Sequence, residues 1–178
     1  MEFKEVVANR REITSFLTKP IPYDVLERIL SSGYLAPTGN NLPSREFIVV
    51  NDKEMLQTLS KTTPYVSWLN EASFAIVITG RPDVSKYWIQ DSSIASSFIW
   101  LSAVNEGIGC AFGAVLNTTD EKESEQRETY VKEALAIPSN RRVLAILGLG
   151  YPNEKPKEKV LPELSEIIYY GKFGENEI

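Results

Sequence analysis

Arg142-Val143-Leu144-Ala145-Ile146-Leu147-Gly148-Leu149 is the clearest buried strand in the sequence, because uncharged and mostly aliphatic residues follow its single charge. Three other short apolar runs predict strands, over residues 47–50, 74–79 and 111–116. Segments with helical spacing lie between the strands, and the longest covers residues 87–105. Short strands that alternate with helices predict an α+β fold in which the helices pack on a sheet.

Length and composition limit the size of this fold. The chain has 178 residues, of which 43% are hydrophobic, and this is enough for one good core but short for two. We therefore expect residues 1–178 to form a single domain.

The charge balance bears on partners and location. With 19 Lys and Arg against 24 Asp and Glu, the formal net charge is −5, which argues against nonspecific attraction to nucleic acid or an anionic membrane. The longest apolar runs are far below the roughly 20 residues that cross a bilayer as a helix. We predict neither a nucleic-acid partner nor a membrane span. A single cysteine, Cys110, and a start without the apolar core of a signal peptide predict a cytoplasmic protein.

The chain contains no histidine. This excludes the usual catalytic triads, every His-ligated metal site and the commonest general base near neutral pH, and no metal site is predicted. Cys110 therefore lacks a histidine partner that could activate its thiol, and its surroundings indicate the start of a buried strand. We interpret Cys110 as structural.

Two features suggest a bound cofactor. The cations Arg10 and Arg11 close the first helical stretch, and such a doublet suits a phosphate. The loop 36–41 follows the second predicted helix and contains Asn40 and Asn41, whose amide groups suit a flat heterocycle. A nucleotide-like cofactor is the first hypothesis.

Five pieces of the sequence together resemble the nitroreductase family, in the same order and at similar distances. They are Asn9-Arg10-Arg11-Glu12-Ile13-Thr14-Ser15-Phe16, the 36–50 loop and strand, Glu106-Gly107-Ile108-Gly109, Ile137-Pro138 and Leu149-Gly150-Tyr151-Pro152. No piece is specific alone, but the likeness extends over nearly the whole chain.

The resemblance implies a fold, an assembly and a cofactor. The fold would be a central mixed, mainly antiparallel sheet flanked by helices, in an intertwined homodimer with an FMN at each subunit interface. A C-terminal arm that contains the apolar segment 167–173 would reach across and add a strand to the partner's sheet. Tails of this kind are usually tied down.

The resemblance also implies a cofactor site. Arg10 and Arg11 correspond to phosphate and ribityl contacts, and Lys157 and Lys159 to a C-terminal basic pair on the same phosphate. Asn41 would contact the edge of the isoalloxazine. The predicted cofactor-binding set is Arg10, Arg11, Glu12, Thr14, Thr38, Gly39, Asn41, Phe112, Gly113, Lys157 and Lys159. The alternatives are plain structural roles: a surface arginine, solvated lysines, an ordinary turn around residue 39 and a glycine bulge at residue 113.

Some positions depart from the family pattern. Glu12 stands where a serine is common, and Thr14 stands where a lysine or arginine is common near the pyrimidine side of the flavin. Loss of that cation should lower the reduction potential unless another donor substitutes. The loop after Asn41 lacks the usual Gln and Trp but contains Arg45, which is expected either to face solvent or to anchor the cofactor. Tyr65 and Trp68 are candidates for the substrate wall, although aromatic residues there are more often core.

The function implied is an FMN-dependent NAD(P)H oxidoreductase. NADH or NADPH would give hydride to flavin N5, and a nitroaromatic, quinone or similar electrophile would then be reduced over the same face. Catalysis needs no histidine, because the flavin carries the chemistry. The alternative from another class is a flavin carrier or sensor without turnover, and a divergent flavin chemistry such as dehalogenation or flavin fragmentation is also open.

Overall fold

The apolar runs of the sequence pair into one antiparallel sheet. In the computed structural model, which describes residues 1–175, the strands are β1 (Arg45–Val50), β2 (Phe74–Gly80), β3 (Gly109–Ala114) and β4 (Arg142–Gly150), in the order β1-β2-β4-β3. Every neighbouring pair of these strands is antiparallel. A parallel bridge between Glu12 and Cys110 at the edge makes the sheet mixed. The predicted α+β class is therefore confirmed, and residues 176–178 of the predicted domain lie outside the described part.

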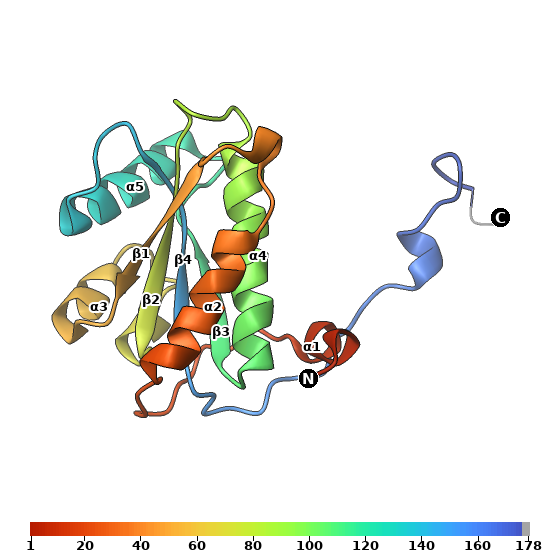
Figure 1. Ribbon diagram of the computed structural model, residues 1–178, viewed down its shortest axis with the longest axis horizontal. Coiled ribbons are helices and arrows are strands. Elements are labelled where there is room, and N and C mark those ends of the chain that lie inside the picture. Colours follow the sequence, from red (N-terminus) through yellow and green to blue (C-terminus); the bar gives the residue numbers. More distant parts are fainter. Residues whose placement is uncertain (176–178) are drawn as a thin grey trace.

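Helices cover both faces of this sheet (Figure 1). Helices α2 (Tyr23–Leu35) and α4 (Trp88–Asn105) pack together on one face, and α3 (Lys53–Leu59) and α5 (Glu121–Leu135) lie on the other. Side chains alternate along β2, which is buried throughout, so that its residues contribute to the core on each side. Because neither face meets water, the central strands are continuously apolar in sequence rather than alternating.

Two helix ends show how far the local signals in the sequence hold. The sequence offers Asn51 or Asp52 as the cap of α3, and Asp52 is the cap, because its side chain accepts a hydrogen bond of 2.8 Å from the amide of Met55. The apolar stripe of the second helix predicts an end at Gly33, but α2 continues to Leu35. Gly33 is an interior residue because α4 approaches closely there: a Cβ on Gly33 would lie 2.6 Å from the side chain of Ile99.

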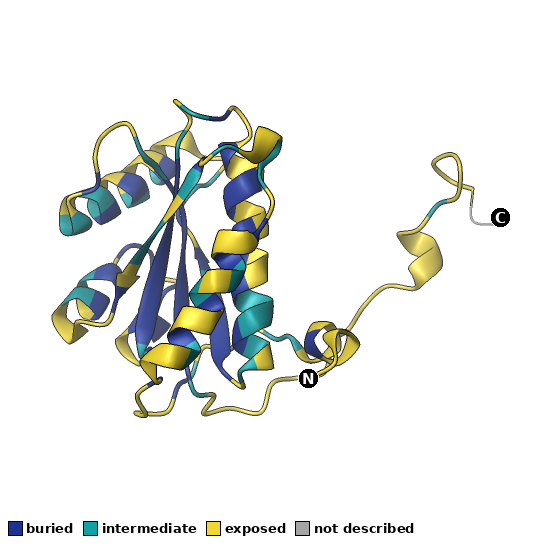
Figure 2. Ribbon diagram, viewed as in Figure 1, coloured by how far each residue is buried: buried dark blue, intermediate teal, exposed yellow. Residues whose placement is uncertain are grey.

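The chain ends are separate from the layered body. Helix α1 (Phe3–Asn9) lies near the end of α4, and the segment after β4 passes beside it and then extends away (Figure 1). The extended part includes the short 3-10 turn η3 (Leu164–Glu166) and is exposed except at Tyr169, which is half-buried (Figure 2). Val160 is 97% exposed and Phe173 is 90% exposed. The described chain thus leaves the apolar arm without a surface to cover it. No helix within residues 1–175 is long and apolar enough to span a membrane.

The core on the α3 side requires a glycine in β4. The indole of Trp68, in the 3-10 turn η2 (Ser67–Asn70), lies against the backbone of β4, and a Cβ on Gly148 would come within 2.3 Å of its ring. The indole is 8% exposed, so it cannot move aside without leaving the core.

We expect Gly148→Ala to lower the free energy of unfolding by about 1–3 kcal/mol through overpacking. Urea unfolding followed by tryptophan fluorescence measures the change. Ala114→Ser, at an exposed position of β3, is the matched control and should stay within about 0.5 kcal/mol of the parent. An unchanged midpoint for Gly148→Ala would show that the Trp68 pocket has room to spare.

Candidate functional site

Cations from opposite ends of the chain lie together beside α1. Arg10 follows the last residue of that helix, and the Lys159 ammonium donates a hydrogen bond of 2.9 Å to the carbonyl of Val7 within it. The pKa of Lys159 is lowered, first by partial loss of water and then by the positive charges of Arg10 and Arg11. The predicted convergence of the N-terminal arginines with Lys159 is thus present in the chain.

The Arg11 side chain joins the two chain segments of this cluster by hydrogen bonds to backbone carbonyls. Nε of the Arg11 guanidinium donates a hydrogen bond of 3.0 Å to the carbonyl of Lys157, and the guanidinium also donates hydrogen bonds to the carbonyls of Ala8 and Arg10. The Lys157 side chain is exposed. Several N–H groups of Arg11 are therefore occupied by bonds that hold the two chain segments together, whereas the contact of the Arg10 guanidinium is with the Trp100 ring.

A carboxylate secures the same two segments further along. Glu154 accepts hydrogen bonds of 2.7 Å and 3.1 Å from the amides of Thr14 and Ser15. The amide of Asn153 donates to the carbonyl of Ser15 at 3.0 Å. Residues 151–159 are therefore fixed along residues 7–17, and this contact sets the direction in which the arm departs.

An aromatic stack connects the cations to the sheet. The Arg10 guanidinium lies 4.9 Å from the centroid of the Trp100 ring, and Trp100 stacks on Phe112 with centroids 6.4 Å apart and planes 7° apart. Glu12 then accepts a hydrogen bond of 3.2 Å from the amide of Phe112. Arg10, Glu12 and Phe112, which the sequence analysis places in one site, are therefore linked by direct contacts through Trp100.

A hollow of about 520 Å³ opens next to this stack. It is lined by Glu12, Thr14, Tyr65, Ser67, Trp68, Glu71 and Phe112. Five of these seven residues belong to the predicted site. The hollow therefore gathers the predicted substrate wall and part of the predicted flavin surroundings.

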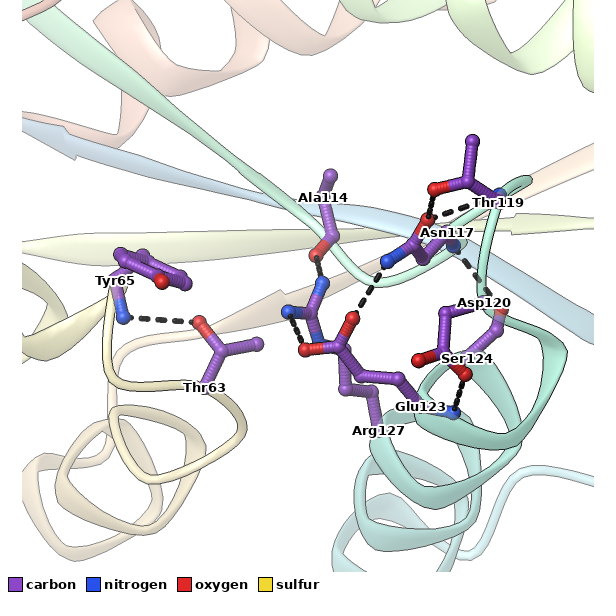
Figure 3. Close-up of polar contacts among 9 residues, drawn as sticks. All are labelled: Thr63, Tyr65, Ala114, Asn117, Thr119, Asp120, Glu123, Ser124 and Arg127. Carbon is purple, nitrogen blue, oxygen red and sulfur yellow. Dashed lines mark hydrogen bonds and ion pairs between the residues drawn. The ribbon is translucent and has the colours of Figure 1, made fainter.

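The two aromatic residues of this hollow differ in exposure. Trp68 is buried beneath it, and Tyr65 is 77% exposed, with its amide donating 3.0 Å to the Thr63 hydroxyl. Figure 3 shows Tyr65 with this hydrogen bond and, in a separate group of contacts outside the hollow, Arg127 of α5, which donates a hydrogen bond of 3.2 Å to the carbonyl of Ala114 and pairs with Glu123. Of the two predicted substrate-wall residues, Tyr65 is therefore exposed at the hollow and Trp68 belongs to the core.

Gly113 has a packing role in this region. A Cβ there would lie 2.4 Å from the side chain of Val66, so the glycine allows η2 to pack against β3. Neighbouring Cys110 is fully buried, and burial raises the pKa of its thiol further above the physiological range. Cys110 is therefore a structural residue whose buried thiol stays protonated.

The amide-rich turn lies in a different part of the molecule. Residues Gly39–Asn41 form the 3-10 turn η1, in which Asn40 and Asn41 both adopt φ of 55°. Thr38 and Asn41 line a second hollow of about 480 Å³, together with Arg45. Arg45 is half-buried, and its guanidinium donates hydrogen bonds to the carbonyls of Gly33, Tyr34 and Ala36 at the end of α2. A cofactor contact by Arg45 stays a prediction.

The turn and the cation cluster are attached to opposite ends of α4. Gly39 is bound to Asp91 near the start of this helix, and Arg10 packs on Trp100, nine residues later and about 14 Å along the axis at 1.5 Å per residue. Figure 1 shows η1 beyond the end of α2 and α1 at the far end of α4. One copy of the chain therefore does not bring Asn41 to Arg10.

Sequence reasoning missed three residues that organise these parts: Trp100, Glu154 and Asp91. Trp100 was one aromatic among many in a long helix, and Glu154 was one acid in a charged segment. Asp91 carried a signal, because it is the sole acidic residue within the otherwise uncharged span of α4.

Comparison with known proteins identifies the chain. A sequence model of the Nitroreductase family matches residues 7–63. A protein of Archaeoglobus fulgidus, provisionally named NADH dehydrogenase/NAD(P)H nitroreductase, is 35% identical over 158 residues, which cover 86% of this chain and 87% of that protein. The chain belongs to the nitroreductase family.

Solved structures of other family members share the fold. A Bacteroides thetaiotaomicron protein with the same provisional name superposes with a TM-score of 0.89 at 26% identity, over 97% of this chain and 99% of that one. An FMN-dependent nitroreductase of Clostridium difficile superposes with a TM-score of 0.86 at 32% identity, over 94% and 98% of the two chains. The predicted family, fold class and assignment as a nitroreductase-like oxidoreductase are confirmed.

Proposed function

We propose that this nitroreductase-family chain is one FMN-binding domain, over residues 1–178, of an NAD(P)H oxidoreductase that reduces nitroaromatics, quinones or similar electrophiles. The name of the Archaeoglobus relative refers to NAD(P)H and that of the Clostridium difficile relative to FMN, which supports this choice of donor and cofactor. The location proposed is the cytoplasm.

The convergence of Arg10, Arg11 and Lys159 carries the proposal. None of these three side chains forms a salt bridge with a carboxylate in residues 1–175. Clustered cations repel one another, and the pKa of Lys159 is lowered first by desolvation and then by the positive charges of Arg10 and Arg11. A phosphate dianion would supply the negative charge and the hydrogen-bond acceptors that this cluster lacks, so the residues fit the phosphate of FMN.

The remaining site residues have assignable tasks. Arg10 and Lys159 would hold the phosphate, and Lys157 is positioned by its carbonyl to support them. The hollow at Glu12, Thr14 and Tyr65 would receive a flat ring and exclude water from one of its faces. When bound, FMN supplies the redox chemistry by accepting hydride from a nicotinamide and passing it to an electrophile.

A second copy of the chain would complete the site. Thr38, Gly39 and Asn41 are proposed ring contacts, yet they are attached to the opposite end of α4 from the cations. The exposed arm supplies a reason for pairing, since Val160, Leu161 and Phe173 lose contact with water only against another surface. We therefore propose a homodimer with arm exchange and flavin between the subunits.

Steady-state oxidation of NADH or NADPH tests the proposed activity. We expect the purified protein to be yellow, to be bleached anaerobically by at least one nicotinamide, and to turn over menadione or nitrofurazone. A yellow protein that neither nicotinamide bleaches would indicate a flavin carrier or sensor, and a colourless protein that does not take up added FMN would rule out both functions.

Arg10→Ala should weaken FMN binding by about 10–100-fold, the usual effect of losing a charged hydrogen-bonding group. Riboflavin, which has no phosphate, should bind the variant and the parent equally. Flavin content after gel filtration and fluorescence titration measure both. Lys4→Ala, an exposed change on α1, is the control for charge alone. Full retention of FMN by Arg10→Ala would refute the phosphate assignment.

Ending the chain at Glu166 should give monomeric or insoluble protein, because this cut removes the apolar residues Ile167, Tyr170 and Phe173 from the arm. Light scattering after size-exclusion chromatography gives the mass. A chain that ends at Glu175 keeps every described residue and is the control. A soluble dimer formed by the shorter chain would count against arm exchange.

A further inference from the structure

Asp91 is an acid buried in the first turns of α4, with 2% of its surface exposed. Its side chain accepts three hydrogen bonds, from the Gly39 amide at 2.8 Å, the Ser44 hydroxyl at 2.5 Å and the Ser85 hydroxyl at 3.3 Å. Two of these donors belong to the segment that contains the turn η1. Burying a carboxylate is unfavourable unless its hydrogen-bonding capacity is filled, so the group and the turn depend on each other.

The three donors tie separate segments to one point. Gly39 lies within the turn and Ser44 just after it, while Ser85 precedes α4 and also accepts a hydrogen bond of 3.1 Å from the Tyr87 amide. The carbonyl of Ser44 accepts a hydrogen bond of 2.7 Å from the amide of Arg81. Both sides of the turn are thereby fixed to the start of α4.

The turn needs such support because of its backbone. Asn40 and Asn41 both have φ of 55°, a left-handed conformation that asparagine adopts more readily than most residues but that two consecutive non-glycine residues keep only where surrounding contacts hold it. The Tyr87 ring presses on the same turn, since a Cβ on Gly39 would lie 2.8 Å from that ring. Gly39 is thus held by a carboxylate on its amide and by an aromatic ring at its Cα.

We infer that Asp91 is a positioning residue that holds the 38–41 turn in the conformation that receives the flat heterocycle of the cofactor. This inference rests on the proposed function. Asp91 acts through Gly39 and Ser44. It differs in this from Arg10, for which we propose a direct contact with the phosphate. The two residues therefore have different expected effects on flavins with and without a phosphate.

The experiment compares the affinities of FMN and riboflavin in four proteins: the parent, Asp91→Ala, Asp91→Asn and Ser96→Ala. We expect Asp91→Ala to weaken both flavins by the same factor of about tenfold, as for loss of a buried hydrogen-bond acceptor, and to alter the visible spectrum of the bound ring. Asp91→Asn retains an oxygen acceptor for the Gly39 amide and should recover most of the affinity. Ser96→Ala changes a buried polar residue on α4 whose hydroxyl binds the Ser92 carbonyl, and it should bind as the parent does.

Amide hydrogen exchange of flavin-free protein is the second measurement. Asp91→Ala should lose protection in residues 38–44, whereas residues 8–16 at the cation cluster should be unchanged. If Asp91→Ala does not fold, Ser44→Ala removes one partner of the carboxylate and should give a smaller change with the same pattern.

Several outcomes would overturn the inference. They are parental affinity of Asp91→Ala for both flavins, a loss confined to FMN, an equal loss in Ser96→Ala, or unchanged protection of residues 38–44. If the parent binds no flavin, the proposed function fails as well; parental binding with an unaffected Asp91→Ala removes this inference alone.

Discussion

The pairing of the N-terminal segment with the segment after β4 is the contact on which the rest of the site depends. Glu154 accepts the amides of Thr14 and Ser15, and Arg11 donates to the Lys157 carbonyl. These polar contacts join residues about 140 positions apart in the sequence. They place the cations of both segments beside one helix end, and without them Lys159 would have no fixed relation to Arg10.

Helix α4 sets the distance between two groups of site residues. Asp91 near its start holds the asparagine turn, and Trp100 further along supports Arg10 and Phe112. Because both groups are attached to one helix that packs on the sheet, their separation does not depend on loop conformation. Rigid elements of this kind keep binding groups in place more reliably than loops do.

The layered fold was predictable because its signals are local. The four apolar runs became the four strands, and Asp52 caps its helix as its position suggests. The end of α2 was misjudged because Gly33 packs under Ile99, a tertiary contact that overrides a common helix stop. Within the site, Arg10 and Lys159 could be anticipated from residue type and resemblance. The roles of Glu154 and Asp91 depend on which backbone amides approach their carboxylates, and a sequence does not contain that information.

The position of Lys159 at the root of the exposed arm links self-association to ligand retention. If the arm docks on a second copy, dissociation of the pair at low protein concentration would free the arm immediately after this ammonium group and would separate the two copies that jointly hold the ligand, whereas Lys159 itself would stay hydrogen-bonded to Val7 of its own chain. Mass action would then make the intensity of the bound chromophore fall on dilution even when free ligand is held constant. In such a molecule the assembly equilibrium and the holo-to-apo equilibrium are a single coupled reaction.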